Sequence, residues 1–435
     1  MKSVGFRSGT TRILAREWEI RARWMTSRAV MSFGDGSQGA LGLPSSVTGV
    51  GGDAYEPTRV DGLPCDVVSV CAGHYHSLAV TSEGLVWAWG RNNEGQLGRG
   101  LAEPRDSWGV PREVEGLDQV KVRAAFASGV ISAAVGIDGS LWVWGKSKRG
   151  QLGLGKGVVE AIRPSRVEAL ARENIVKVSL GWGHILALCE NGKLYGWGYS
   201  ADGRLGIMGG SETSLLESNV GIPTGGQQLE LVKKLVMEGI EKEKEMPVIW
   251  EPRLLTEVRD IEVVDVACGL DHTLILSRDT TLLSGGSNAY SQLGRETDNL
   301  GMAAVKLSHI PLSVSSGLGH SFCICQEPDA QESRSIVSWG WNQNHQLGRS
   351  GPHNISQVIR ELEDETPVSV SGGRVHSIAL TSNGKAWVWG CGKNGRLGLG
   401  SSMDETEPCL LEWSACSEIL QVSAGYDHNL ILVTD

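Results

Sequence analysis

The stretch Trp87-Ala-Trp89-Gly90-Arg-Asn-Asn-Glu-Gly95-Gln96-Leu97-Gly98 is the fullest copy of a phrase that occurs seven times along the chain. The glycine that ends its first half recurs at spacings of 56, 55, 53, 88, 54 and 50 residues, at Gly34, Gly90, Gly145, Gly198, Gly286, Gly340 and Gly390. A repeat period of about 50 residues is typical of propellers and other repeat architectures. The residues that follow each of these glycines, up to the final Leu-Gly, are called the tail below.

A second phrase, Gly-x-x-His followed by an apolar run, alternates with the first, and its Gly-x-x-His part is called the turn. Complete turns end at His76, His184, His272, His320, His376 and His428, and a degenerate one runs from Ser128 to Ile131. The chain opens on a tail and closes on a turn, so one repeat is split between the two termini. Two complementary halves can pair and close a ring, which removes exposed sheet edges.

Each repeat contains enough strand signals for one propeller blade. Around His76 the runs 66–70, 77–80 and 85–89 read as three strands of a meander. A proline marks the outermost strand of five repeats, because proline cannot donate to a ladder and belongs at an edge: Pro57, Pro111, Pro164, Pro252 and Pro408. The sequence therefore predicts an all-β, seven-bladed β-propeller over residues 30–434, closed by pairing of the N- and C-terminal half-repeats.

The repeated aromatic and polar residues are interpreted as structural. Tryptophans at equivalent places are expected to pack between blades: Trp87, Trp89, Trp142, Trp144, Trp197, Trp339, Trp387 and Trp389. The repeat histidines lie one to a blade, so we expect each to be buried and hydrogen-bonded rather than part of a metal or catalytic cluster. The nine cysteines include no CxxC pair, which favours reduced core thiols.

The charge is distributed unevenly. Residues 1–28 hold seven Lys and Arg against two Glu, a local charge of +5 in a chain of net charge −10, which leaves −15 for the rest. A helix over this segment would place Leu14, Trp18 and Met25 on one side. Residues 1–29 are therefore predicted to be a basic amphipathic leader that acts as a mitochondrial transit peptide; a solvated basic arm, with residence in the cytoplasm or nucleus, is the alternative. The acidic body disfavours direct nucleic-acid binding and suits basic protein partners.

One repeat carries an insertion at about residues 208–247. Val232, Val236 and Ile240 lie at helical spacing and are followed by a run of alternating Glu and Lys, which predicts a charged helix. Partner-binding candidates on it are Lys233, Lys234, Glu238, Glu241 and Lys242. The alternative is a surface loop without function, because long insertions cost little.

These phrases resemble the repeats of the regulator of chromosome condensation family, over all of the chain except its leader. The resemblance implies a seven-bladed propeller closed by shared terminal strands. The Arg-rich leader that runs directly into the first tail looks like a plant mitochondrial branch of that family, associated with transcript processing for a respiratory complex I subunit.

We accordingly expect a non-enzymatic, organellar interaction scaffold that supports RNA processing or splicing, or complex I biogenesis, with no cofactor and no bound metal. Its predicted contact surface is the face that carries the turns, with Tyr75, Trp182, Asp271, Arg374, Tyr426 and Asp427. Partners would be proteins, with basic RNA-binding or RNA-processing factors as the first class.

The family resemblance leaves two other functions open. The first is guanine nucleotide exchange on a small GTPase, although the charged insertion differs from the family's hairpin wedge. The second is ultraviolet-B photoreception, which we place last because only Trp182 matches the repeated Trp-Arg pairs of such receptors, and no arginine follows it.

Overall fold

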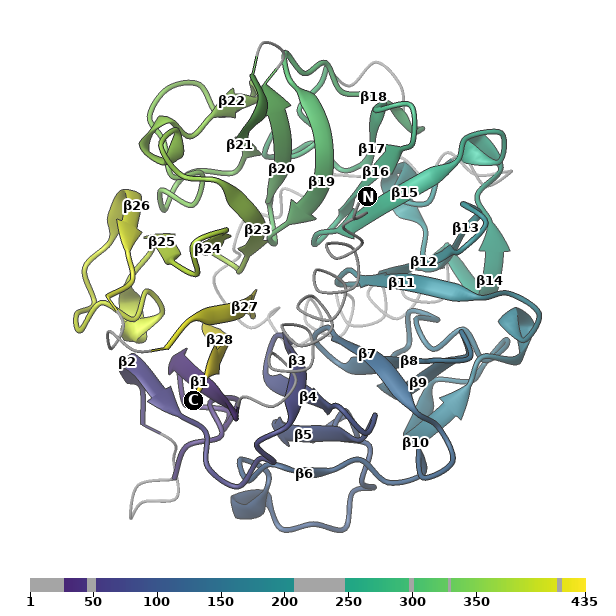
Figure 1. Cartoon of the computed structure of the whole chain (residues 1–435). Coiled ribbons are helices and arrows are strands. Elements are labelled where there is room, and N and C mark those ends of the chain that lie inside the picture. The colour runs from purple at the N-terminus through teal and green to yellow at the C-terminus, as the bar shows by residue number, and fades with distance from the viewer. Residues whose placement is uncertain (1–26, 45–51, 207–246, 297–300, 328–329, 413–416) are drawn as a thin grey trace, which may run out of the picture.

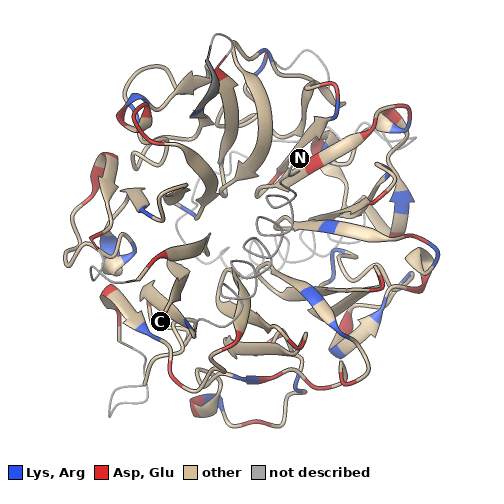
Figure 2. Cartoon of the chain, in the orientation of Figure 1, with Lys and Arg blue, Asp and Glu red and all other residues tan. Residues whose placement is uncertain are grey.

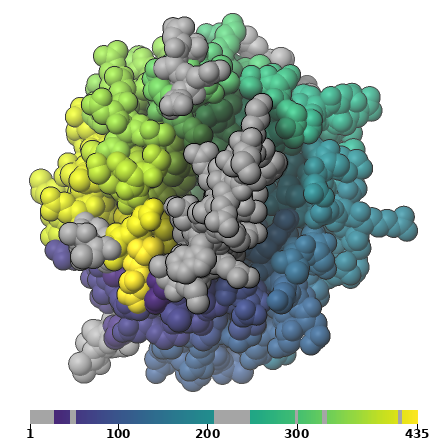
Figure 3. Space-filling model, viewed as in Figure 1, coloured from purple at the N-terminus to yellow at the C-terminus, as the bar shows by residue number. Residues whose placement is uncertain are grey.

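The computed structural model describes residues 27–44, 52–206, 247–296, 301–327, 330–412 and 417–435. These residues form seven four-stranded antiparallel sheets arranged as blades around a common axis (Figure 1). The blades follow one another around the disc in sequence order, as the colours of Figure 3 show. The predicted all-β, seven-bladed propeller is confirmed.

Each blade is a meander whose first strand lies nearest the axis. From the axis outward, blade 1 contains β27 (Ile419–Ala424), β28 (His428–Thr434), β1 (Arg28–Gly34) and β2 (Ala54–Arg59); blade 2 contains β3 (Val67–Ala72), β4 (His76–Thr81), β5 (Val86–Gly90) and β6 (Arg112–Glu113); blade 3 contains β7 (Val122–Ala127), β8 (Ile131–Gly136), β9 (Leu141–Lys146) and β10 (Glu160–Arg166). Blade 4 contains β11 (Ile175–Leu180), β12 (His184–Cys189), β13 (Leu194–Tyr199) and β14 (Val248–Leu254); blade 5 contains β15 (Val263–Cys268), β16 (His272–Ser277), β17 (Leu282–Gly286) and β18 (Ala303–Ala304). Blade 6 contains β19 (Ile310–Ser316), β20 (His320–Glu327), β21 (Ala330–Gly340) and β22 (Gln357–Val358); blade 7 contains β23 (Pro367–Gly372), β24 (His376–Thr381), β25 (Ala386–Gly390) and β26 (Glu405–Leu410).

Blade 1 closes the ring with strands from both ends of the chain. Strand β1 pairs with β28 in unbroken register from Arg28 opposite Thr434 to Gly34 opposite His428. This pairing confirms closure by the two half-repeats. The first strand begins at Arg28, two residues before the expected start of the propeller at residue 30.

The outermost strands fall into two classes. Four blades have edge strands of six or seven residues, each with a proline at a shift in register: Pro57, Pro164, Pro252 and Pro408. The other three have two-residue edge strands, and there an arginine directly after the tail donates to a third-strand carbonyl: Arg99 to Ala88, Arg295 to Ser284 and Arg349 to Ser338. The guanidinium group thus binds the third strand beside an edge strand that is too short to cover it.

Helical structure among the described residues is limited to six single turns of 3₁₀ helix. They are η1 (Arg105–Ser107), η2 (Glu168–Leu170), η3 (Ala201–Gly203), η4 (Thr256–Val258), η5 (Arg360–Leu362) and η6 (Lys393–Gly395). None of the helices in the described residues is long and apolar enough to cross a membrane. The predicted helical insertion and its candidate residues, and the leader up to residue 26, lie outside the described residues.

Buried tryptophans join neighbouring blades. Trp89, Trp144, Trp197, Trp339 and Trp389 are completely buried. In each, the indole Nε1–H donates to a carbonyl in the preceding blade's tail at 2.8–3.0 Å, the acceptors being Ala40, Gln96, Gln151, Gln292 and Gln346. Packing between blades, as predicted, is therefore the role of these side chains, and each also satisfies its one polar atom.

The repeat histidines join the same blades through a second set of hydrogen bonds. Each imidazole Nε2 lies 2.7–3.1 Å from a hydroxyl or amide oxygen of the next blade, in the pairs His76–Ser132, His184–Thr273, His272–Ser321, His320–Ser377, His376–Asn429 and His428–Ser77. The five hydroxyl groups donate their own proton to a tail carbonyl, as Ser321 does to Gln292 at 2.8 Å. The imidazole must then be the donor at Nε2. Because burial lowers the pKa of these rings, as at His272, the ring is neutral and carries its one proton on Nε2.

The seventh junction lies between blades 3 and 4 and contains neither group. Ile131 stands where the other blades have histidine, and Ile185 stands where they have Ser, Thr or Asn. Both isoleucines are fully buried in one apolar cluster. The histidine prediction is confirmed for six blades, and the seventh replaces both members of the pair together.

Candidate functional site

The turns form a ring on one face of the propeller, which we call the turn face. In six turns the backbone N–H of the second residue donates to a carbonyl in the next blade, as His74 does to Ser128 at 3.0 Å and Leu270 to Leu318 at 2.8 Å. The second residues also line the mouth of a cavity of about 210 Å³ on the propeller axis: His74, Trp182, Leu318, Arg374 and Tyr426. The backbone of the turns is thus held in place by neighbouring blades, so their side chains are presented on a rigid frame.

Four aromatic side chains from three different blades meet at this mouth. The His74 ring stacks on Trp182 with centroids 5.0 Å apart, and it lies 5.3 Å from Tyr426, which is also 5.3 Å from Tyr75. Blade 3 stands between His74 and Trp182, and its turn has Gly129 at this place; a β-carbon there would lie 2.9 Å from His74 Nδ1. The glycine therefore leaves the space in which the two rings stack.

Two arginines flank this aromatic cluster. Arg91 lies over Tyr75 at 5.3 Å and Arg374 over Tyr426 at 4.7 Å, distances at which cation–π attraction operates. Arg374 also forms a two-pronged ion pair with Asp427 at 2.8 and 3.0 Å. Burial lowers the pKa of Arg374, but the Asp427 carboxylate outweighs this effect, so the net shift is upward.

The histidine in the cluster is neutral at physiological pH. Burial, and to a smaller degree the charge of His428, lowers the pKa of His74 to about 4. The pKa of Tyr75 is raised, first by burial and then by Tyr426. The mouth therefore presents uncharged aromatic surface bordered by two ion-paired arginines, Arg374 with Asp427 and Arg91 with Glu94.

Asp427 and Asp271 each bind a buried arginine. Asp427 lies 3.2 Å from the guanidinium of Arg396, and Asp271 lies 2.5 Å from that of Arg204, both arginines being almost inaccessible to solvent. Arg204 and Arg396 occupy the tail place that is glutamine in four repeats, and only the turns that follow these two tails have aspartate as their third residue. The two carboxylates thus stabilise buried cations, in addition to any role at the surface.

The structure gathers five of the six turn-face candidates and separates the sixth. Tyr75, Trp182, Arg374, Tyr426 and Asp427 belong to the cluster at the mouth, whereas Asp271 contacts Arg204 instead. Six further side chains lie on or beside the turns and were not among the residues predicted to contact a partner: His74, Arg91, Arg149, Tyr199, Tyr290 and Trp341. A signal was present for three of them, since Tyr199, Tyr290 and Trp341 put aromatic residues at tail places that are polar in most other repeats.

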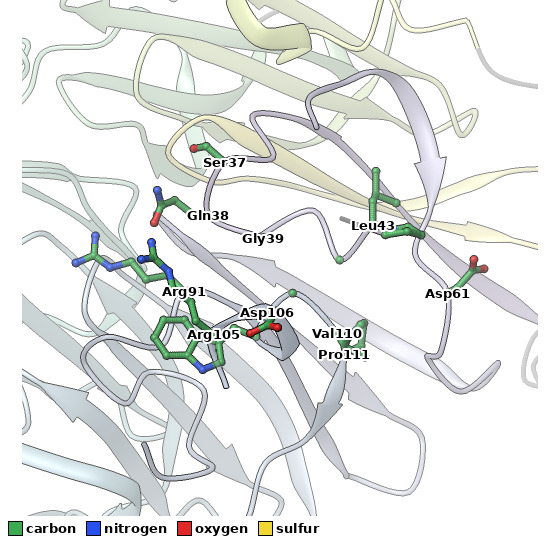
Figure 4. Close-up of a pocket in the computed structure, with 14 residues that line it drawn as sticks. Ser37, Gln38, Gly39, Leu43, Asp61, Arg91, Arg105, Asp106, Val110 and Pro111 are labelled. Atoms are coloured by element: carbon green, nitrogen blue, oxygen red, sulfur yellow. The ribbon is translucent and has the colours of Figure 1, made fainter. Parts of the chain in front are cut away.

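A groove of about 800 Å³ adjoins the turn face between blades 1 and 2. Figure 4 shows Arg91 and Gln38 toward one end, with Leu43, Val110 and Pro111 toward the other. Arg105 and Asp106 lie side by side on its wall, so opposite charges are mixed along it. The groove is large enough to hold a short peptide segment or a small ligand.

The repeat histidines are engaged between the blades. Burial lowers the pKa values of His76, His272, His320 and His376 to about 3, and each binds the next blade. Among the described residues there is no group of three or more potential metal ligands. Lys and Arg residues are interspersed with Asp and Glu residues around the rim of the disc (Figure 2).

Comparison with known proteins finds several relatives of similar size. The Arabidopsis thaliana ultraviolet-B receptor UVR8 is 28% identical over 393 residues, covering 88% of this chain and 77% of the receptor. The mitochondrial protein RUG3 of Arabidopsis thaliana, which contains an RCC1 domain, is also 28% identical, over 397 residues that cover 88% of this chain and 80% of that protein.

A solved structure agrees with the fold. Saccharomyces cerevisiae Prp20p, studied for its binding to Gsp1p and histones, superposes with a TM-score of 0.75 at 22% identity, covering 94% of this chain and 92% of that one. The model of the RCC1-like domain matches residues 29–431, which is nearly all of the propeller. This chain belongs to the RCC1-like domain family of β-propellers.

Proposed function

We propose that this chain is a non-enzymatic scaffold that binds partner proteins through its turn face. The observation that carries the proposal is the distribution of aromatic residues that serve no repeated structural role. Four of the six tyrosines lie on this face, together with two tryptophans outside the buried set: Tyr75, Tyr199, Tyr290, Tyr426, Trp182 and Trp341. Trp, Tyr and Arg dominate the residues that contribute most to protein interfaces.

The position of the tail aromatics supports a single continuous surface. The backbone N–H groups of Tyr199 and Trp341 donate to the third residue of their own blade's turn, Gly183 and Gly319, at 2.7 and 2.9 Å. Tyr290 is 47% exposed and lies 5.4 Å from Trp341. Large aromatic area is therefore available beside the turns and is held on rigid backbone, which lowers the entropy cost of binding.

We further propose that the protein acts in mitochondria, where it supports RNA processing or splicing, or complex I biogenesis. The support is the arginine-rich composition of residues 1–28 together with 28% identity to a mitochondrial relative. Basic RNA-processing factors are the proposed partners, because the remainder of the chain carries a charge of −15. No feature of the described residues favours nucleotide exchange. Capture of a small GTPase is nevertheless one possible result of the purification described next.

The contact surface can be tested by affinity purification of the full chain from isolated mitochondria. Truncation of both Tyr75 and Tyr426 to alanine is expected to abolish recovery of the partners, since both rings belong to the cluster at the mouth. Tyr55→Ala is the control, because Tyr55 is a solvent-exposed tyrosine on the edge strand β2, away from the turns. Equal recovery by all three proteins would contradict the proposed surface, and a captured GTPase with accelerated nucleotide release would favour exchange activity.

The proposed location has a separate test. Residues 1–30 fused to a fluorescent reporter are expected to direct it to mitochondria. A reporter that stays in the cytosol would contradict a mitochondrial transit peptide; the purification would then be made from a whole-cell extract, and the contact surface would be judged there.

A further inference from the structure

Two turns have glycine as their third residue, and large tail side chains lie across both. A β-carbon on Gly183 would lie 3.1 Å from Cβ of Tyr199 and 3.3 Å from Cδ of Arg149. A β-carbon on Gly319 would lie 3.3 Å from Cβ of Trp341. We call these places the Gly183 shelf and the Gly319 shelf. In the other five turns a side chain occupies the third place, so a residue from a tail has less room to lie flat on the backbone.

The two shelves differ in charge. The Gly319 shelf carries Tyr290 and Trp341, which are uncharged aromatic groups. The Gly183 shelf carries Arg149, whose guanidinium lies over the Tyr199 ring at 5.7 Å. A cation is therefore held against an aromatic ring on the turn face, beside the half-buried Trp182.

Arg149 lacks a counterion within the part of the chain that the structure describes. Its cation–π contact with Tyr199 is the one interaction found for its guanidinium there, although the residue is half-buried. Arg204 lies over the same ring at 4.8 Å, but its charge is balanced by Asp202 at 2.9 Å and Asp271 at 2.5 Å. The two guanidinium groups thus share one ring, and only that of Arg204 is neutralised.

This arrangement fits a carboxylate. The guanidinium is planar and has five N–H donors whose spacing matches the two oxygens of a carboxylate. The contact with the Tyr199 ring restricts the guanidinium in advance, which reduces the entropy lost when the hydrogen bonds form.

We propose that the Gly183 shelf binds an aspartate or glutamate side chain of the partner protein, with Arg149 as the donor. The proposal rests on the proposed function, because it specifies the chemistry of one contact on the turn face. A protein carboxylate fits better than the phosphates of RNA, since Asp202 and Asp271 lie in the same group and the whole chain is acidic, which repels a polyanion. The shelf accepts one acidic residue in a partner whose overall charge can still be basic.

The test uses the full chain and peptides in place of the partner. A fluorescein-labelled glycine–serine peptide with one central glutamate is titrated with the protein, and its anisotropy is compared with that of the same peptide carrying glutamine and of a labelled oligouridylate. We expect the glutamate peptide to bind more tightly than both. Arg149→Gln should weaken that binding about tenfold, which corresponds to about 1.4 kcal/mol, and Arg149→Lys should recover only part of it, because lysine keeps the charge but loses the planar fork.

Arg172→Gln is the matched control, because Arg172 is an exposed arginine with no ion pair in the described part of the chain and with no ring contact. Its expected change is less than twofold. Equal binding of the glutamate and glutamine peptides, equal loss in the two glutamine variants, or tighter binding of the oligouridylate would each overturn the proposal. Because no mitochondrial partner is used, these results are independent of the capture experiment with Tyr75 and Tyr426, so the two proposals can fail separately.

Discussion

Six blade junctions are joined by a buried polar contact, and the seventh is joined by apolar packing. Six place a buried imidazole against a hydroxyl or amide of the next blade, and the junction between blades 3 and 4 places Ile131 and Ile185 in one apolar cluster. No junction leaves a histidine facing an apolar residue or a hydroxyl facing isoleucine. What the repeat preserves is therefore the pairing across a junction, because a buried polar group without a partner costs more than an apolar pair of similar shape.

A second pair of positions follows the same rule. Where the tail has Arg204 or Arg396, the next turn has Asp271 or Asp427, and where the tail has glutamine the turn has no aspartate. A buried guanidinium is stable only with a counterion, whereas glutamine needs none. Both rules predict that changing one member of a pair destabilises the propeller and that changing both restores part of the loss.

The largest effect is expected for Asp427→Ala. The substitution removes the carboxylate shared by Arg396, which is buried, and Arg374, which is half-buried. We expect a loss of about 3–4 kcal/mol in the free energy of unfolding, the lower part of the range of about 3–5 kcal/mol for removal of one partner of a buried ion pair, because Asp427 is partly exposed. Urea denaturation followed by tryptophan fluorescence measures it.

Arg396→Gln in the Asp427→Ala background provides the control. It places glutamine where Gln96, Gln151, Gln292 and Gln346 stand, so it should recover about half of the lost stability while removing the unpaired buried charge. Losses that simply add in the double variant would show that the two positions are not coupled.

The next largest effect is expected for Ile131→His alone. It puts a buried imidazole opposite Ile185, which offers no acceptor, and we expect a loss of about 3 kcal/mol. Adding Ile185→Ser supplies the missing acceptor, and the carbonyl of Gln151 is available to it as that of Gln292 is to Ser321. The double variant should recover about 1–2 kcal/mol in the same denaturation assay; no recovery would mean that the pairing does not govern this junction.

The sequence was sufficient to predict the architecture and the burial of the repeat groups. The spacing of Gly34 to Gly390 predicted seven blades, and the position of the first tail predicted the closure through β1 and β28. These features are encoded within one repeat or at the chain ends, so a single sequence reveals them. Proline positions on the edge strands were predicted for the same reason.

The contacts between blades could not be predicted in the same way. Arg204 and Asp271 are 67 residues apart, and Arg396 and Asp427 are 31 apart, so nothing in the local pattern brings either pair together. Both aspartates were interpreted as surface contacts, whereas each also neutralises a buried arginine. His74 and Trp182 belong to blades 2 and 4, and their stacking depends on Gly129 in the blade between them, which a reading of single repeats does not consider.

A smaller effect is expected for Ser321→Ala. The substitution leaves the Nε2–H of His272 without an acceptor, while the carbonyl of Gln292 keeps the indole of Trp339 as a donor. We expect a loss of about 2 kcal/mol in thermal or chemical denaturation. Ser82→Ala is the control, because the Ser82 hydroxyl binds Asp66 at the surface and its loss should change stability by less than about 0.5 kcal/mol. Equal effects would contradict the importance of the junction.

The last expected effect is on the pH dependence of stability. Burial lowers the pKa of His272 from 6.5 to about 3 in the folded chain, so between these values the unfolded chain binds a proton that the folded chain does not. The free energy of unfolding must then fall as the pH decreases through this window, by about 1.4 kcal/mol per pH unit for each such histidine. Replacing both His272 and Ser321 with isoleucine copies the junction of blades 3 and 4. The slope of the free energy of unfolding against pH should then decrease by the contribution of one histidine, about 1.4 kcal/mol per pH unit. Urea denaturation at pH values from about 6.5 down to 4.5 measures the slope. The isoleucine pair has no group that binds a proton, unlike the pair of His272 and Ser321. An unchanged slope in the double variant would therefore show that His272 is not the group that titrates.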